Sequence, residues 1–529
     1  MNYDNYKFSQ YETQNAETRW ATMHEIQSTT LKINLKDDHY PYAGVPMIND
    51  GETAYIDNLD NHSLVFGSTG SKKTRLFCMP TLNIILKGGE SFVTTDPKGE
   101  LYAKTSGLAK ELGYDVVVLN FRDLDCGDCW NPFSLPYQLY HQGDKDGAVA
   151  RLNDFVEAIS EQQSKTTKDI FWVTAAKSVA LSVLITMVEC CTKEECNIKT
   201  FTRFCSAFAS GTQDIALFKA CGGDEDDIQK NYLNEIMNLA RKDSIARLNY
   251  DGLAYSSERA KGDIQGNLFT LISAFLTQEN LVRNLSNDTF NMIDIGRKKT
   301  ALYIIIPDER TNYHFIATTF IKQCYETLIM LAQNQETLKV PVRVNFVLDE
   351  FANIPKIPDM SSMISAGRSR DLKFFLVLQS MHQLRSKYGD DASQTIKGNC
   401  ENWIFLASKE LELLEEISGL AGSVEHYSKG GYQNVPLISQ SQLQRLDKQS
   451  GEALIFCARH YPFISKMADI DDCCFPKLPS APQTKIDNMS VISISPEDLY
   501  LDLIESKRNL PFKGAAMNGI NLKTVCTPS

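Results

Sequence analysis

The sequence lacks a hydrophobic run long enough to cross a membrane, and it lacks a secretory signal. Its longest apolar stretch, Ser178 to Val188, has about half of the roughly 20 residues that a transmembrane helix needs. The N-terminus, MNYDNYKFSQYETQ, does not show a basic segment followed by an apolar one. The sequence therefore predicts a cytoplasmic protein.

An excess of basic residues is also absent. The chain has 54 Lys and Arg against 66 Asp and Glu, which gives a net charge of −12. This balance argues against a protein whose whole outer surface binds nucleic acid, although it leaves room for a basic channel inside a ring.

Cysteine pairs at metal-ligand spacing are scarce, although the chain has 14 cysteines. Without an export signal, scattered cysteines indicate reduced thiols rather than a disulfide framework. The CxxC at Cys126 and Cys129 has no second ligand pair, so it is weak evidence for a zinc site.

What the sequence does contain is a long alternation of strands and helices. At 529 residues it exceeds the roughly 250 to 300 residues at which one core stops growing, so two or more domains are expected. Apolar strand patterns such as HSLVF, ESFVTT and VVVLNF are separated by helical segments, and five more strand patterns follow residue 295. Between residues 143 and 294, apolar residues recur mainly at helical spacing. This order predicts the α/β fold class, with a large, mostly parallel sheet and an inserted all-α domain.

The predicted domain boundaries follow these changes in pattern. They are a polar, irregular N-terminal extension packed on the first strand (1–60), the first part of the α/β domain (61–142), the all-α domain (143–294), the second part of the α/β domain (295–475) and a loosely held C-terminal tail (476–529).

The stretch GSTGSKKT follows the first strand of the α/β domain and nearly matches the phosphate-binding pattern G-x-x-x-x-G-K-[ST]. Backbone N–H groups of such a loop bind phosphate, a lysine reaches the terminal phosphates and a hydroxyl binds Mg²⁺. We assign nucleotide binding to Gly67, Ser68, Thr69, Gly70, Ser71, Lys72, Lys73 and Thr74, with Thr74 as a Mg²⁺ ligand. Alone, this octet could also be an ordinary Gly/Ser turn before a helix.

Paired carboxylates end the strand pattern NFVLDEF, on a strand predicted to be adjacent to that of the octet. In P-loop enzymes such an aspartate binds Mg²⁺ and the next glutamate can orient the attacking water, roles that fit Asp349 and Glu350. The alternative is a solvated strand end. Gln379 ends the next strand and could sense the γ-phosphate. Arg368 and Arg370 could act as arginine fingers toward a neighbouring subunit, although surface arginines are usually only solvated charges.

Longer segments resemble one known family. They include ETRWATMHEI, HSLVFGSTGSKKT, VTTDPKGELY, WNPF and IKGNCENWIFLAS, and the block NFVLDEFANIPKIPDMSSMISAGRSRDLKFFLVLQSMHQLRSKYG is highly specific. They are similar in sequence and order to TraG-like coupling proteins of type IV secretion and conjugation, relatives of the FtsK and HerA motors.

The resemblance implies a fold and a function. It implies a RecA-like P-loop nucleotide-binding domain, an all-α domain for substrate docking, and ATP and Mg²⁺ as cofactors. It also implies a hexameric ring that receives a relaxase bound to single-stranded DNA, or a protein substrate, and hands it to a type IV secretion channel. Lys73 and Thr74 would match the family's nucleotide-binding pair, Asp349 and Glu350 its carboxylates and Gln379 its sensor.

Two departures from the family pattern affect these expectations. Family members usually begin with transmembrane helices, so we expect recruitment to the inner face of the cell membrane through a separate anchor subunit. Lys72 replaces the second glycine, and a left-handed backbone there would cost roughly 1 to 2 kcal/mol. Such a cost would weaken nucleotide binding about tenfold, so we expect an ATPase that is retained but slow.

Two other functions stay open. The chain could be a catalytically degenerate adaptor that recruits substrates without ATP turnover. It could also be a cytoplasmic translocase of the FtsK and HerA kind that acts on duplex DNA, which the acidic balance and the DPKGE segment disfavour.

Overall fold

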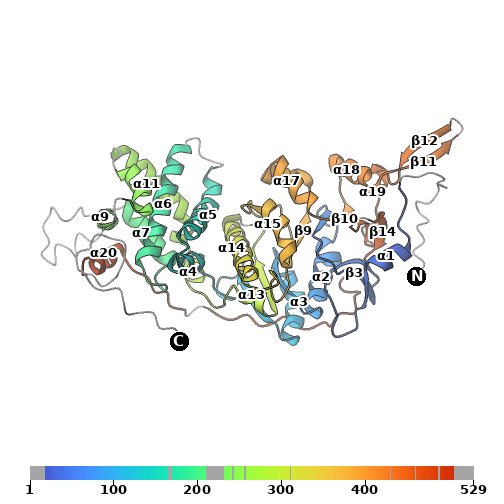
Figure 1. Ribbon diagram of the computed structural model, residues 1–529, viewed down its shortest axis with the longest axis horizontal. Helices are drawn as coiled ribbons and strands as arrows, with labels where there is room; N and C mark the ends of the chain where they lie inside the picture. Colours follow the sequence, from blue (N-terminus) through green and yellow to red (C-terminus); the bar gives the residue numbers. More distant parts are fainter. Residues whose placement is uncertain are drawn as a thin grey trace. The chain divides into compact units, whose positions relative to one another are not determined.

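The computed structural model describes most of the chain as two units (Figure 1). The described residues are 18–164, 170–209, 232–240, 243–254, 258–309, 311–428, 431–458, 460–486 and 489–505. The α/β unit contains the chain up to Asp123 and Asn291–Thr484, and the helical unit contains Leu124–Phe290 and the chain from Lys485 onward.

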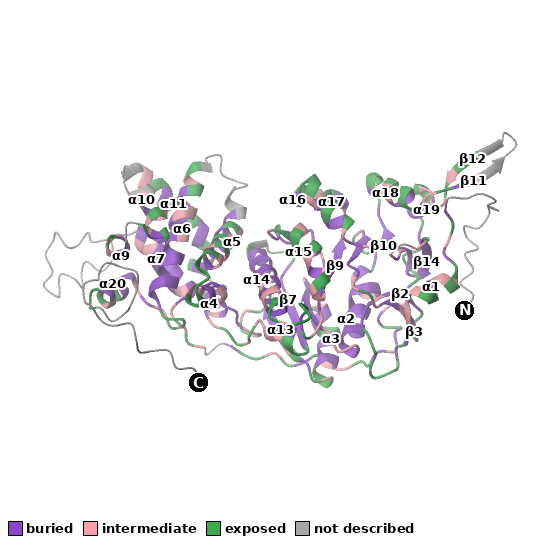
Figure 2. Ribbon diagram, viewed as in Figure 1, coloured by how far each residue is buried: buried purple, intermediate pink, exposed green. Residues whose placement is uncertain are grey.

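A nine-stranded sheet forms the core of the α/β unit. Its strands, in spatial order, are β14 (Phe463–Lys466), β13 (Glu452–Phe456), β10 (Asn402–Ala407), β4 (Ser63–Gly67), β9 (Leu372–Leu378), β8 (Val344–Leu348), β5 (Ser91–Thr95), β7 (Thr300–Ile305) and β6 (Asp115–Asn120). The strands from β10 to β6 run parallel, and β13 and β14 are antiparallel to their neighbours. Continuous apolar runs suit strands that are buried on both faces, and every residue of β4, β8 and β9 is buried (Figure 2).

Helices cover both faces of this sheet, as in a doubly wound fold. They are α2 (Met79–Lys87) and α3 (Glu100–Glu111) on one side, and α14 (His314–Gln333), α15 (Met360–Gly367), α16 (Met381–Tyr388) and α17 (Asp390–Gly398) on the other (Figure 1). Right-handed crossovers explain the division, because the chain moves one way along the sheet through α2 and α3 and the opposite way from β7 to β10. The predicted fold class is confirmed.

Smaller elements complete the α/β unit. They are the helices α13 (Asp294–Arg297), α18 (Leu411–Ala421) and α19 (Gln440–Leu443), and the hairpin of β11 (Ser423–Ser428) and β12 (Gly431–Pro436).

The N-terminal extension is not the irregular segment that the sequence suggested. From residue 18 it contains α1 (Met23–Thr29) and a three-stranded antiparallel sheet of β1 (Leu31–Asn34), β3 (Thr53–Asp57) and β2 (Val45–Asn49). It contacts the large sheet at the edge strand, where Asn49 bridges Met467 and accepts a hydrogen bond from Ala468 N at 2.8 Å. Ile33, Ala54 and Ile56 of the extension also share one core cluster with Val65 of β4. Strands of four or five residues give too short an alternation to be recognised in the sequence.

The helical unit is built around one long apolar helix. Its helices are α4 (Ser134–Gln142), α5 (Lys145–Ser164), α6 (Ile170–Cys190), α7 (Ile198–Ala209), α9 (Tyr232–Leu239), α10 (Ile245–Ala254), α11 (Glu258–Thr277), α12 (Glu279–Asn284) and α20 (Pro496–Ile504). The window Phe171–Cys190 is long and apolar enough to span a membrane, so the apolar helix is longer than the sequence suggested. However, 67% of that window is buried inside the protein, as in the core helix of a bundle.

The C-terminal segment is also more ordered than a loose tail. Ala481 N donates to Ser106 Oγ at 3.0 Å, which holds this part against α3 in the α/β unit. Further along, Ile494 N donates to Thr200 Oγ1 at 3.3 Å, and α20 buries Leu499 and packs on α9 and α7 in the helical unit. The expected boundary at residue 476 therefore falls inside ordered structure, and residues 506–529 lie outside the described part.

Candidate nucleotide-binding site

The octet lies at the carboxyl end of β4, between two parallel neighbours. Ser68 N donates to Ala407 O of β10 at 2.8 Å, and Ser71 N donates to Ser68 O at 3.0 Å, so the loop turns back on itself. Gly70 has φ 77° and Lys72 has φ 62°, both in the left-handed region. The position where the pattern has its second glycine therefore does require a left-handed backbone, and a lysine occupies it.

The helix after the octet is not one continuous α-helix. A π-helical segment, Thr74–Cys78, comes first, and α2 begins at Met79 with Pro80 in its first turn. Pro80 has no N–H with which to donate to the carbonyl four residues earlier, so the hydrogen-bond ladder changes register there. The octet still leads directly into a helix N-terminus, as phosphate binding requires.

Lys73 and Thr74 face the paired carboxylates of β8. Lys73 Nζ donates to Gly67 O at 2.6 Å and lies 3.9 Å from Glu350 Oε1. Thr74 Oγ1 donates to Asp349 Oδ2 at 2.8 Å. The structure thus brings together the two halves of the predicted site, which are separated by 275 residues in the sequence.

Asp349 is buried, and its burial shifts its pKa. Burial raises the pKa of the Asp349 carboxyl to about 6, with the nearby charge of Glu350 acting in the same direction. The hydrogen bond from Thr74 and the charge of Lys73 oppose this rise in pKa. A carboxylate in such a place is costly without a partner, which is typical of functional sites.

Gln379 joins the octet to Glu350. Its Nε2 donates to Glu350 Oε2 at 2.6 Å, and its Oε1 accepts from Thr69 Oγ1 at 3.1 Å. This contact corrects the expectation that β4 and β8 are adjacent, because β9 lies between them and ends at Leu378, one residue before Gln379. The central strand therefore places the glutamine between the other two groups.

Glu350 has an unusual backbone. Its φ is 53°, in the left-handed region that non-glycine residues rarely adopt. Its N–H donates to Asp349 Oδ1 at 3.0 Å, and Asn353 Nδ2 donates to its Oε2 at 3.1 Å. Strain of this kind persists only where surrounding contacts hold it, and it is concentrated at functional sites.

The antiparallel strands at the edge of the sheet add residues that the sequence did not indicate. Asp469, after β14, lies 3.8 Å from Lys72 Nζ and accepts from Arg75 Nε at 2.9 Å. The Arg75 hydrogen bond lowers the pKa of Asp469, so its carboxylate is a stable counterion for Lys72. Lys448, before β13, donates to Ser68 Oγ at 3.2 Å. No sequence pattern indicates Lys448 or Asp469, because they reach this edge only through the antiparallel pairing of β13 with β10 and β14.

The DPKGE aspartate lies at the carboxyl end of β5, on the same side of the sheet. Asp96 Oδ2 accepts from Tyr102 N at 2.8 Å, so it fixes the first turn of α3. Burial raises the pKa of Asp96 to about 6.

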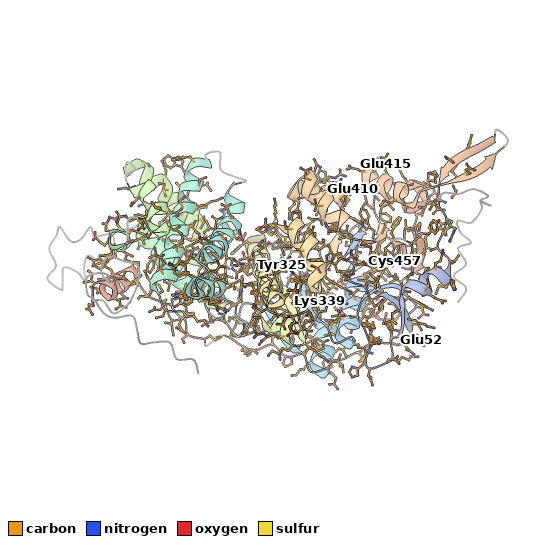
Figure 3. All side chains as sticks on the ribbon, in the orientation of Figure 1. Glu52, Tyr325, Lys339, Glu410, Glu415 and Cys457 are labelled. Carbon is orange, nitrogen blue, oxygen red and sulfur yellow. The ribbon has the colours of Figure 1, made fainter. Side chains whose placement is uncertain are left out.

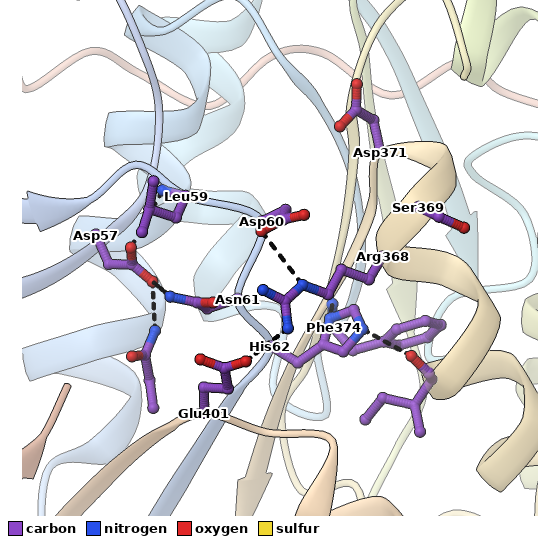
Figure 4. Close-up of polar contacts among 12 residues, drawn as sticks. Asp57, Leu59, Asp60, Asn61, His62, Arg368, Ser369, Asp371, Phe374 and Glu401 are labelled. Atoms are coloured by element: carbon purple, nitrogen blue, oxygen red, sulfur yellow. Dashed lines mark hydrogen bonds and ion pairs between the residues drawn. The ribbon is translucent and has the colours of Figure 1, made fainter. Parts of the chain in front are cut away.

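The two arginines do not join this site within one chain. They form a short 3₁₀ turn, Arg368–Arg370, at the amino end of β9, so they lie at the opposite edge of the sheet. Arg368 contacts Glu401 at 2.6 Å and Asp60 at 3.3 Å (Figure 4). Arg370 Nη1 donates to Ala366 O at 2.8 Å.

Beyond Gln379, the chain is anchored at the N-terminus of α16. Ser380 accepts from Gln383 N at 3.4 Å, and Glu410, labelled in Figure 3, accepts from Met381 N and His382 N at 2.9 Å each. A carboxylate at this helix end is electrostatically favourable, so the backbone that follows Gln379 is held in place.

The oxygen donors at the octet fit a magnesium ion. Mg²⁺ takes hard oxygen ligands, typically one or two carboxylates together with substrate phosphates. Asp349 and Thr74 place a carboxylate and a hydroxyl 2.8 Å apart beside the phosphate loop.

Comparison with known proteins agrees with this geometry. Residues 17–433 match the family described as type IV secretory system conjugative DNA transfer. The chain belongs to this family. Among its relatives, it is 23% identical to the protein VirD4 of Rhizobium radiobacter, over 83% of this chain and 61% of VirD4. It is 22% identical to a conjugal transfer protein TraG of Escherichia coli, over 75% of this chain and 61% of TraG.

Solved structures of coupling proteins are similar to this chain in fold. The unbound monoclinic form of the conjugative coupling protein TrwBdeltaN70 has a TM-score of 0.60 at 15% identity and covers 90% of this chain and 97% of that one. TrwB in complex with ADP and Mg²⁺ has a TM-score of 0.57 at 13% identity, over 92% and 97% of the two chains. The RecA-like fold and the resemblance to TraG-like coupling proteins are thereby confirmed. The chain spans about three fifths of the length of the curated relatives that it matches.

Proposed function

We propose that this chain is an ATP-driven coupling protein that delivers a relaxase bound to single-stranded DNA, or a protein substrate, to a type IV secretion channel. One observation carries the proposal. Lys73, Thr74, Asp349, Glu350 and Gln379 come from three strands and meet at one point of the sheet edge. The family supports a role in conjugative DNA transfer, and the likeness to TrwB, solved with ADP and Mg²⁺ and with a non-hydrolysable ATP analogue, supports nucleotide binding.

Each of these residues has its own role in the proposed phosphoryl transfer. A bound Mg²⁺, held by Thr74 and Asp349, would neutralise phosphate charge. Lys73 neutralises the terminal phosphates once its ammonium turns from Gly67 O toward them. Glu350 accepts a proton from the attacking water and orients it, while the Gln379 amide fixes the Glu350 carboxylate and links it to Thr69.

We further propose that the working form is a ring, with six subunits as the expected number. Arg368 and Arg370 lie away from their own chain's octet, so only a neighbouring subunit's nucleotide is accessible to them as fingers. We place its action at the inner face of the membrane, together with the components of the channel.

The helical unit is the proposed docking domain. It exposes large apolar side chains at helical spacing, with Phe269 and Leu276 on α11 and Ile245 and Leu248 on α10. Residues seven or three apart share one face of a helix, so each pair presents an apolar stripe to a partner.

The test is Mg²⁺-dependent ATP turnover as a function of protein concentration, with single-stranded DNA added. Wild type should hydrolyse ATP at a specific rate that rises as subunits associate, and Glu350→Gln and Lys73→Ala should abolish turnover. Glu415→Gln, an exposed glutamate on α18, is the matched control and should match wild type. Turnover in Glu350→Gln at the wild-type rate would refute the assigned site.

A second candidate, a recruiting adaptor without turnover, is favoured by one observation, the lysine in a left-handed conformation inside the octet. If wild type is inactive at every concentration while Lys72→Gly hydrolyses ATP, the adaptor is the correct function. In that case, the protein should still bind a relaxase or protein substrate when no nucleotide is present.

A further inference from the structure

A lysine from the far end of the chain reaches the octet. Lys448 Nζ donates to Ser68 Oγ at 3.2 Å, across 380 residues of sequence. Ser68 is the first residue after β4, so Lys448 lies where the loop begins. We infer that Lys448 is a further nucleotide-binding residue, whose ammonium contacts the phosphate chain of the bound nucleotide. The inference rests on the proposed function, because it concerns the same site.

The topology of the sheet explains how Lys448 gets there. β13 is antiparallel to β10, with Leu454 opposite Phe405 and Phe456 opposite Trp403. The residues before β13 must therefore lie at the edge where the parallel strands β10 and β4 end. A parallel strand in this position would place Lys448 at the opposite edge of the sheet, away from the octet.

The loop that carries Lys448 is fixed on both sides. Asp447 N donates to Glu452 Oε2 and Gln449 N donates to Asp447 Oδ1, both at 2.9 Å. Gly451 has φ 71°, and a Cβ there would collide with Met467 O, so the turn into β13 cannot shift without breaking the pairing with β14. The backbone of Lys448 is thus held next to the octet, while its side chain is exposed.

Charge distinguishes Lys448 from the other lysines of the site. Lys72 lies beside Asp469, and Lys73 lies beside Glu350. Lys448 forms no ion pair with any described residue, and the group to which it donates is the neutral hydroxyl of Ser68. No carboxylate of a described residue therefore offsets its ammonium beside the proposed phosphate loop, and phosphate oxygens are strong acceptors for such a donor.

The experiment measures Mg²⁺-dependent binding of ADP, the slowly hydrolysed analogue ATPγS and adenosine to the purified full chain by calorimetry. Lys448→Ala should weaken the binding of ADP and ATPγS by about five- to twentyfold, as expected for the loss of a partly screened hydrogen bond from a charged group. Adenosine affinity should not change, and Lys448→Arg should bind ADP nearly as wild type does. Lys466→Ala, which removes an exposed lysine at the end of β14 near the same edge, is the matched control and should leave ADP affinity unchanged.

The outcomes separate the inference from the proposed function. Wild-type affinity for ADP in Lys448→Ala, or an equal loss of affinity for ADP and adenosine, would overturn the phosphate contact. Wild type that binds no nucleotide would overturn the proposed function and the inference together. If the difference in ADP affinity between wild type and Lys448→Ala becomes smaller as salt is added, a direct charge contact is supported. Lys466→Ala should match wild type in ADP affinity at every salt concentration.

Discussion

Lys72 departs from the phosphate-loop motif, and the structure shows how the folded loop accommodates it. The folded loop already holds Lys72 at φ 62°, with its carbonyl bonded to Leu76 N at 2.9 Å. The left-handed strain is therefore a cost of folding the loop rather than of binding phosphate. The pair with Asp469 offsets part of this cost, although a half-exposed pair contributes little.

We therefore expect Lys72→Gly to change stability more than nucleotide affinity. Glycine removes strain of roughly 1 to 2 kcal/mol but adds freedom to the unfolded chain, so a net stabilisation of up to about 1 kcal/mol is expected. The Kd for ADP should change by less than about threefold. Thermal melting and ADP titration measure the two effects, and a tenfold tighter Kd at unchanged stability would place the strain in binding instead.

Gln379 gives a second test at the residue scale. Gln379→Glu would place a carboxylate next to Glu350 Oε2, which lies 2.6 Å from the Gln379 amide. The two negative charges would repel and displace Glu350, the group proposed to orient the water. ATP turnover should fall by at least about 100-fold while ADP binding changes little. The control is Gln440→Glu on α19, an exposed position where the same change should be neutral. A parallel loss of ADP binding would assign Gln379 to binding rather than to turnover.

At the scale of elements, the sequence predicted what depends on long apolar patterns. The strands of the parallel sheet, the helical insertion and the carboxyl-edge positions of Asp349, Glu350 and Gln379 all follow from such patterns and their order. Strand neighbours could not be predicted, because pairing of β9 between β4 and β8 is a long-range property. For the same reason Lys448 and Asp469 were missed.

One histidine ties three elements together at the amino edge of the sheet. His62 lies directly before β4. Its Nε2 lies 2.8 Å from Ile364 O of α15, and its Nδ1 accepts a hydrogen bond from Phe374 N of β9 at 3.1 Å (Figure 4). Burial lowers the pKa of His62 to about 4, and the positive charges of Arg368 and Lys373 act in the same direction. The hydrogen bond to Ile364 and the charge of Asp60 oppose this lowering. The neutral ring is therefore the form that the fold requires.

This histidine should make the fold sensitive to acid. The unfolded chain takes up the proton below about pH 6.5, whereas the folded chain does so only near pH 4, so stability is lost as the pH falls between these values. The loss is at most about 3 kcal/mol. Buried carboxyls with raised pKa titrate in the same window with the opposite sign, so the informative quantity is the difference between wild type and His62→Gln. That difference in melting temperature should shrink from pH 7 to pH 4, and a constant difference would contradict the assignment.

At the scale of the whole molecule, the arginines proposed as fingers lie at the edge of the sheet opposite the octet of their own chain. The octet and its carboxylates lie at the carboxyl edge of the sheet, and Arg368 lies at the amino edge of the same sheet. In a head-to-tail ring, the surface of one subunit meets a different surface of the next, so opposite edges of two copies can meet. Arg368 already rests on Glu401 and Asp60, and it must leave them to reach another subunit.

Mixing two inactive variants tests this arrangement. Arg368→Ala and Lys73→Ala should each abolish turnover alone, because each removes one half of every site. In an equal mixture, about a quarter of the interfaces join an intact octet to an intact arginine, so turnover should return to roughly that fraction of wild type. Mixing Lys73→Ala with Glu350→Gln is the control, because both residues belong to one chain's site, and any interface with both intact needs a wild-type subunit. Recovery in the first mixture and none in the second places Arg368 in the neighbour's site, whereas no recovery in either confines it to the contacts with Glu401 and Asp60 at the amino edge.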